Sequence, residues 1–145
     1  MSRRTSIVKA LAEKFKNIDG TTGTYKLNLF GNAYPYLRFW DEVQDFPAVY
    51  MAAGTEVREY HPGNLTWGFL TVSIKIYTKG EDSGQILEDL LEDVETVIDA
   101  NRQLVYDVTT QNETTEILVQ SIVTDDGLLA PYAIGEMNIQ VRYLV

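Results

Sequence analysis

The sequence predicts an α+β fold in which two helices pack on one face of a mainly antiparallel or mixed β-sheet. Two stretches repeat apolar residues at helical spacing, and several others alternate apolar with polar residues as strands do. The order of these elements along the chain is α-β-β-β-α-β-β. The 145 residues, 45 % of them hydrophobic, can bury a sizeable core, so we expect one domain over residues 1–145.

The first helix is expected to begin after Thr5 or Ser6, because either hydroxyl can accept a hydrogen bond from a free N–H group of the first turn. Its apolar side chains recur every three or four residues: Ile7, Val8, Leu11, Ala12, Phe15 and Ile18. Gly20 and then Gly23 are expected to end it. Residues 24–30 alternate apolar and polar side chains, which predicts a short strand.

Three further segments precede the second helix. Residues 31–44 mix glycine and proline with large aromatic side chains and predict an irregular loop, with a short strand considered at residues 37–40. Residues 46–53 and 67–77 predict strands, and the apolar positions of the second alternate so regularly that we expect a sheet covered on one face only. Residues 54–66 between them are interpreted as a long projecting loop, which is typical of functional or mobile segments.

The second helix follows a turn at Lys79 and Gly80. Asp82 is its expected cap, with Gln85 completing a capping-box-like pair. Its apolar stripe comprises Ile86, Leu87, Leu90, Leu91, Val94, Val97 and Ile98. The acidic residues of this helix are expected mostly on its opposite side.

The end of the chain predicts two more strands. They span residues 116–124 and 134–145, with Met137, Ile139, Val141 and Tyr143 facing inward. A turn at residues 125–127 follows the first of them, and Pro131 interrupts the connection. The pattern assigns no structure to residues 101–115.

Composition and motifs argue against most chemistry. Twelve basic and 21 acidic side chains give a formal charge of −9, which opposes phosphate-neutralising contacts with nucleic acid. No cysteine is available for a disulfide or a thiolate zinc site, no stretch is long and apolar enough for a membrane span, and we expect no membrane partner. His61, the single histidine, lies in a turn without a nucleophile pattern, and no glycine-rich phosphate loop precedes either helix.

Two minor alternatives stay open. The acid pairs of the second helix, or Asp125 with Asp126, could contribute to a divalent-cation site. The aromatic residues Tyr34, Tyr36, Phe39 and Trp40 could stack nucleobases, although core or subunit contact is more typical of such a cluster with a single arginine. We therefore expect no catalytic residue, no cofactor and no bound metal.

Several short motifs occur in a recognisable order. They are Asp45-Phe46-Pro47-Ala48-Val49, Gly54-Thr55-Glu56, Ile76-Tyr77, Glu81-Asp82-Ser83, Asp125-Asp126-Gly127 and Val141-Arg142-Tyr143. Together with the first helix, they make most of the chain resemble the tail terminator proteins of long-tailed bacteriophages of the lambda type.

The resemblance implies a virion structural protein, assembled in the host cytoplasm, that forms a homo-hexameric ring at the head-proximal end of the tail. The ring would cap the tail tube, end its elongation and offer a joining surface to a neck or head-completion protein. DNA would pass through the ring without specific binding. A neck or tail-completion protein of similar fold is the nearest alternative, and a small acidic hydrolase or metal-dependent enzyme is a third.

Candidate interface residues follow from the resemblance and from charge. Heterologous ring contacts join two different patches, so the basic start of the chain and the acidic second helix are candidate complements, and residues 54–66 are a candidate arm. The candidates are Arg3, Arg4, Phe46, Pro47, Glu56, Arg58, Glu59, Tyr60, His61, Glu88, Asp89, Glu92 and Asp93.

Overall fold

The central element of the protein is a five-stranded sheet with the strand order β1-β2-β3-β7-β6. The computed structural model describes residues 2–20 and 24–145. The strands are β1 (Ala33–Tyr34), β2 (Ala48–His61), β3 (Leu65–Lys79), β6 (Glu116–Thr124) and β7 (Tyr132–Leu144). All neighbours are antiparallel except β1 and β2, which are parallel.

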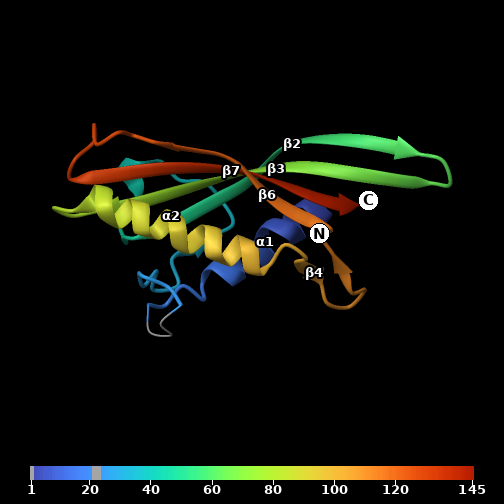
Figure 1. Ribbon diagram of the computed structural model, residues 1–145, viewed down its shortest axis with the longest axis horizontal. Helices are drawn as coiled ribbons and strands as arrows, with labels where there is room; N and C mark the ends of the chain where they lie inside the picture. Colours follow the sequence, from blue (N-terminus) through green and yellow to red (C-terminus); the bar gives the residue numbers. More distant parts are fainter. Residues whose placement is uncertain (1, 21–23) are drawn as a thin grey trace.

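Two helices, α1 (Arg3–Phe15) and α2 (Ser83–Ala100), lie on the same side of this sheet (Figure 1). A single 3₁₀ turn, η1 (Trp40–Glu42), and a small second sheet of β4 (Val105–Asp107) and β5 (Asn112–Glu113) complete the elements. The predicted α+β class and element order are confirmed. Neither helix in residues 2–20 and 24–145 has the length and apolar character that a membrane crossing needs.

The core lies between the helices and the sheet. Alternate side chains of β3 and β7 are buried there, as their period-two pattern predicts: Leu70, Val72, Ile74, Ile76, Met137, Ile139, Val141 and Tyr143. Both predicted apolar stripes of the helices pack against them, except for Ile86, which is half-buried and lies outside this cluster. Burial of one such side chain contributes about 1.5–3 kcal/mol, so this layer is the main source of stability.

The helix ends differ from the prediction. Ser2, rather than Thr5 or Ser6, caps α1, and its hydroxyl accepts a hydrogen bond from the Thr5 N–H group at 3.1 Å. Asp82 occupies the cap position of α2 but makes no capping hydrogen bond, and Gln85 donates to Asp89 instead. The predicted stop at Gly23 lies outside the described residues.

The predicted strand at residues 24–30 is wrong over its described length, because this segment forms only one isolated bridge, Asp19 to Asn28. The reason is that its backbone donors are already engaged. The N–H groups of Lys26 and Leu27 donate to the carboxylate of Asp93 on α2. The strand considered at residues 37–40 is also absent, and the extended residues of that region are those of β1 instead.

The second face of the sheet is only partly open, which corrects the expectation of a sheet covered on one face. The loop that connects β1 to β2 folds over one end of it. Tyr34 stacks on Tyr50 with ring centroids 4.9 Å apart, and Val43, Ala48, Tyr50 and Tyr77 form a second buried cluster there. The rest of this face carries polar side chains such as Ser73 and Asn138, which are hydrogen bonded to each other.

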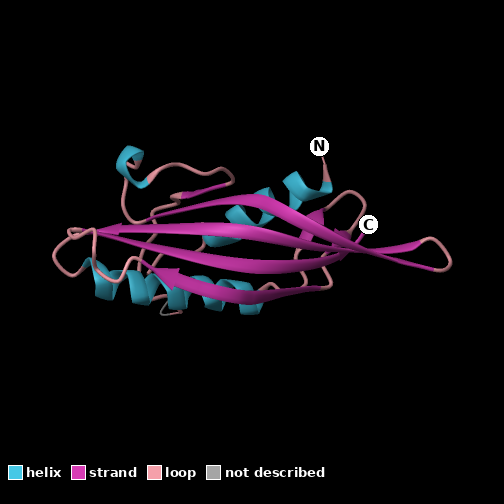
Figure 2. Ribbon diagram, turned by 90° about the horizontal axis from the view of Figure 1, so that it is seen from above, coloured by secondary structure: helices cyan, strands magenta, loops and turns pink. Residues whose placement is uncertain are grey.

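Residues 54–66 are not a loop. β2 continues to His61, a three-residue turn reverses the chain, and β3 begins at Leu65. Gly63 and Asn64 adopt the positive φ angles, 82° and 63°, that the reversal requires. We call residues 55–66 the arm. The two long strands of this hairpin extend past the rest of the molecule (Figure 2).

The predicted strand at residues 116–124 is confirmed as β6, and that at residues 134–145 as most of β7. The turn at residues 125–127 is confirmed too, with Asp126 and Gly127 at positive φ. The unassigned residues 101–115 form the small β4–β5 hairpin, which packs against α1.

Candidate assembly surfaces

The arm is a two-stranded ribbon with solvent on both sides. Pairing of β3 with β7 ends at Trp67 and Leu144, so most of the arm has no third strand beside it. Val57 is 62 % exposed and Tyr60 is 74 % exposed, and Leu65 is exposed as well. Apolar side chains that project in this way, without a core to join, are typical of a protein interface.

Three contacts fix the base of the arm to the body. The Arg4 guanidinium donates to the Gly54 carbonyl, the Tyr143 hydroxyl donates to Glu56 Oε1 at 2.5 Å, and the Val145 N–H donates to the Thr66 carbonyl at 2.8 Å. They come from α1, from β7 and from the residue after β7. The arm therefore leaves the body in one direction that elements distant in sequence determine together.

Glu56 is placed by a β-bulge. Between Ala53 and Glu56 the register with β3 shifts, which turns the Glu56 side chain toward Tyr143. The side chain is only 5 % exposed and also pairs with Arg58 at 2.7 Å. Burial raises the pKa of the Glu56 carboxyl, but the hydrogen bonds from Tyr143 and Arg58 outweigh burial, so the pKa lies below its usual value.

Burial raises the pKa of the Tyr143 hydroxyl to about 12, and the hydrogen bond to Glu56 adds to that rise. Of the predicted arm residues, Glu56 and Arg58 form an ion pair with each other at the base. Glu59 and His61 lie nearer the tip and are 2.6 Å apart between Oε1 and Nε2. Tyr60 lies close enough to Arg58 for a side-chain hydrogen bond, and its ring is presented to solvent.

The predicted acidic surface of α2 is smaller than expected. Glu88 and Glu92 are exposed and Asp89 is half-buried. Lys26 lies beside them, with Nζ 2.5 Å from Glu92 Oε2 and 4.0 Å from Asp89 Oδ1. The hydrogen bond that the Lys26 ammonium group donates to Glu92 raises the pKa of that ammonium group, and burial opposes the rise.

Asp93 does not lie on this surface. Its side chain is 2 % exposed, and its two carboxylate oxygens accept hydrogen bonds from the N–H groups of Lys26 and Leu27 at 2.9–3.1 Å. A buried charge is tolerated because backbone donors satisfy it. Asp93 therefore holds residues 24–30 against α2, and we withdraw it from the candidate interface.

The remaining predicted residues lie in two places. Arg3 is exposed on α1, and Arg4 reaches the base of the arm. No ion pair within residues 2–20 and 24–145 joins either arginine to the acids of α2. Phe46, near the end of the β1–β2 loop, packs on Tyr132, and the Pro47 carbonyl accepts a hydrogen bond from Asn32 at 3.2 Å.

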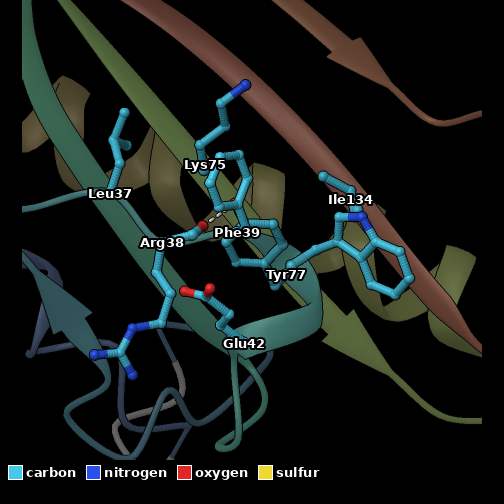
Figure 3. A pocket seen from close by; sticks show the side chains of 8 residues that line it. Leu37, Arg38, Phe39, Glu42, Lys75, Tyr77 and Ile134 are labelled. Atoms are coloured by element: carbon cyan, nitrogen blue, oxygen red, sulfur yellow. Dashed lines mark hydrogen bonds between the residues drawn. The ribbon is translucent and has the colours of Figure 1, made fainter.

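An aromatic groove was missed by the sequence reasoning. It has a volume of about 480 Å³ and lies between residues 37–42 and the open face of the sheet (Figure 3). Phe39 is 75 % exposed on its wall, while the Tyr77 hydroxyl at its floor donates to the Arg38 carbonyl at 2.7 Å. Burial raises the pKa of that hydroxyl to about 12. The mixture of glycine, proline and aromatics signalled a loop, but not the fold of that loop over the sheet.

The sheet edge at β6 was missed as well. Four of its apolar side chains are exposed: Leu118, Val119, Ile122 and Val123. The residues described on that side place no strand against its outer edge.

No group of three or more histidine, aspartate and glutamate side chains is placed to hold a metal ion in the part of the chain described. The surfaces that the fold presents, an arm, a groove and an open strand, are suited to contacts with other proteins.

Comparisons with known proteins agree with this. A family model described as Bacteriophage Tail Tube Terminator Protein matches residues 1–145. The chain is 38 % identical over 152 aligned residues to the tail tube terminator protein p142 of Escherichia phage T5, covering 99 % of this chain and 94 % of that protein. A chain from the virion of a native gene transfer agent particle has the same fold, with a TM-score of 0.60, 11 % identity and coverage of 96 % and 95 %.

Proposed function

Since the chain belongs to the bacteriophage tail tube terminator family, we propose that six copies form a ring on the last ring of tail tube subunits and end tube growth. As a structural protein of the virion tail, the ring binds tail tube protein on one face. Its other face joins a neck or head-completion protein after assembly in the host cytoplasm. The role needs no catalysis and no cofactor.

The arm is the observation that carries this proposal. A subunit that works alone gains nothing from an exposed valine and tyrosine on a ribbon that extends beyond its core, whereas a closed ring needs one patch to meet a different patch on the next copy. The contacts of Arg4, Tyr143 and Val145 aim the ribbon before any neighbour arrives. Such preorganisation lowers the cost of association.

Charge supports the passage of DNA through the ring. Six copies at −9 each carry a formal charge of 6 × −9 = −54. This acidity repels phosphate groups, so DNA can slide through the channel without being held by ion pairs.

Charge also supports a contact between neighbouring copies. Arg3 and the acids Glu88, Asp89 and Glu92 are on different elements and do not pair within one copy. We include Arg3 and those three acids in the interface on this ground. The arm residues are included because they project from the body, and Phe46 and Pro47 because they belong to the motif that resembles the family. Lys26 already neutralises part of the acidic surface, so the electrostatic contribution is secondary to that of the arm.

The test of the proposal removes the apolar contacts of the arm. The variant Val57→Ser with Tyr60→Ser should fold normally, because both side chains are exposed, but should form fewer hexamers and fail to stop growth of tubes assembled from purified tube subunits. Val108→Ser is the matched control, since Val108 is 75 % exposed but lies on the β4–β5 connection. Light scattering measures the ring, and electron microscopy measures tube length.

Three outcomes would count against the proposal: tubes that elongate freely with the wild-type protein present, wild-type binding only to a head connector, or an arm variant that acts like the control. Binding to the connector alone would favour the neck protein alternative. Replacement of Glu88, Asp89 and Glu92 with lysine tests the electrostatic part separately, and unchanged hexamers would remove that part. Asp93 is left intact in this variant because it is buried.

A further inference from the structure

The outer edge of β6 is an unusual surface for a protein that stays soluble. Residues 117–123 read Ile-Leu-Val-Gln-Ser-Ile-Val, with no charge and no proline. Val123 is 58 % exposed, and three other apolar side chains of the strand are exposed too. Native proteins protect such edges with lysine, proline or a covering element, because an open apolar edge pairs with another strand. The β6 edge has a β-bulge between Val119 and Ser121 but none of these other protections, so we expect it to be covered in the working assembly.

The sheet has a second open edge on its opposite side. β1 pairs with β2 only at Val49 and Tyr50, and Arg4 occupies the Gly54 carbonyl. Beyond that point, residues 56–61 of β2 pair with β3 on one side and have no strand on the other. Two different open edges on opposite sides of one sheet are the arrangement that a heterologous contact requires.

We propose that β6 of one copy pairs with residues 56–61 of β2 in the next copy, so that the sheet continues from subunit to subunit. This proposal rests on the ring proposed above, and its occupant is a second copy of this chain. The bound edge supplies the backbone partners that each edge lacks, and the exposed apolar side chains of both edges come together.

Strand direction fits this pairing. β2, β3, β7 and β6 are successively antiparallel, so β6 runs opposite to β2. Rotation about an axis roughly along the strands keeps the direction of every strand. The β2 strand of the neighbour therefore runs antiparallel to β6, which is the more stable pairing.

The register can be derived from the sheet. Glu56 lies opposite Leu70 and, two strands further on, level with Ile117. If the strands were parallel to the ring axis, residues 56–61 of the neighbour would thus extend past the start of β6 in this copy. Strands in closed sheets tilt by about 35–45°. Across four strands spaced about 4.8 Å, this tilt shifts the neighbour by about 13–19 Å, or about four to six residues. A shift of the neighbour away from the tip of its own arm brings its position 56 opposite about 121–123, and its residues 56–61 then lie alongside β6.

Charge does not oppose the contact. Within the arm, Glu56 forms an ion pair with Arg58, and Glu59 forms a hydrogen bond with His61. Residues 117–123 carry no charge at all. Neither edge therefore has to bury a carboxylate or guanidinium group that lacks a hydrogen-bond partner when the two meet.

Disulfide mapping tests the pairing, and the chain is suited to it because it contains no cysteine. Double variants combine cysteine at one of Val57, Glu59 or His61 with cysteine at one of positions 118–122. Each assembled ring then holds both positions at every interface, and paired strands bring the Cα atoms within the ~7 Å that a disulfide allows. Single-cysteine variants serve as controls for folding and for random oxidation.

Antiparallel pairing predicts a reciprocal pattern. As the arm position rises by two, the β6 position that cross-links best falls by two, and the two residue numbers sum to about 177–179. A pattern in which both numbers rise together, or rings seen by electron microscopy without any cross-link, would overturn the pairing but leave the ring intact. Absence of any ring would overturn both proposals.

Hydrogen exchange on the unmodified protein gives an independent measurement. When rings form on tube ends, exchange of amides in residues 56–61 and 117–123 should slow by at least tenfold. Amides at the β4–β5 connection should not change. Protection of the arm without protection of β6 would assign the arm to a tube subunit instead, and would overturn the proposal.

Discussion

Asp93→Ala tests the role of the buried carboxylate between α2 and residues 24–30. The substitution leaves the N–H groups of Lys26 and Leu27 without their acceptor. A hydrogen bond to a charged group contributes about 1.5–3 kcal/mol. Water can reach part of residues 24–30, so we take the lower value of this range for each of the two N–H donors. We therefore expect a loss of about 3 kcal/mol in the free energy of unfolding.

Urea denaturation measures this loss. With a slope of about 2 kcal/mol per molar urea, the midpoint should fall by about 1.5 M with the slope unchanged. Asp93→Asn keeps one oxygen acceptor and should lose about half as much. Glu88→Ala is the control on the exposed side of the same helix and should change stability by less than about 0.5 kcal/mol. A value for Asp93→Ala within that same range would refute the assignment of Asp93 as a structural acceptor.

Three further predictions concern the sheet. Tyr143→Phe should lower the free energy of unfolding by about 1.5 kcal/mol, because Glu56 loses a hydrogen-bond donor. The lowered pKa of Glu56 means that its stabilisation is present above pH 4.5 and is lost as the pH falls. In urea titrations, the free energy of unfolding of the variant should therefore fall less on acidification than that of the wild type. At high pH, stability should instead fall as the pH rises, because the pKa values of Tyr77 and Tyr143 are raised to about 12, against 10 in the unfolded chain. Their stabilisation is complete below pH 10 and is lost toward pH 12. A tyrosinate titration in which both groups ionise near pH 10 would contradict this. Gly68→Ala would place a Cβ atom 2.8 Å from the Tyr143 ring and should cost about 1–3 kcal/mol by thermal melting, whereas Gly84→Ala, with open space around it, should cost nothing.

The regular core strands were predictable because burial on one face leaves a period of two in the sequence. The alternation from Leu70 to Ile76, and from Met137 to Tyr143, is of this kind. The arm leaves no such record, since no core covers either of its faces and its apolar and polar residues do not alternate. The available signal was the turn at Gly63 and Asn64, flanked by residues of high strand propensity.

The candidate surface was harder to predict for a different reason. Asp93 and Glu92 are neighbours in an acidic run, and only their tertiary partners distinguish them. Asp93 is buried against backbone donors 66 and 67 residues away in sequence, while Glu92 is exposed beside Lys26. Charge patterning gives the sign of a helix face but not the one position that the fold turns inward.

The arm also affects when a ring can close. The contacts of Arg4, Tyr143 and Val145 order the base of the arm. Beyond them, two strands without a third are marginally stable in water, so the tip must be ordered at each encounter between free copies. In the ring proposed above, a tube end that already carries one copy would hold the next at high effective concentration and offset that entropy. Ring closure would then depend on the presence of a tube end more than on the amount of free protein.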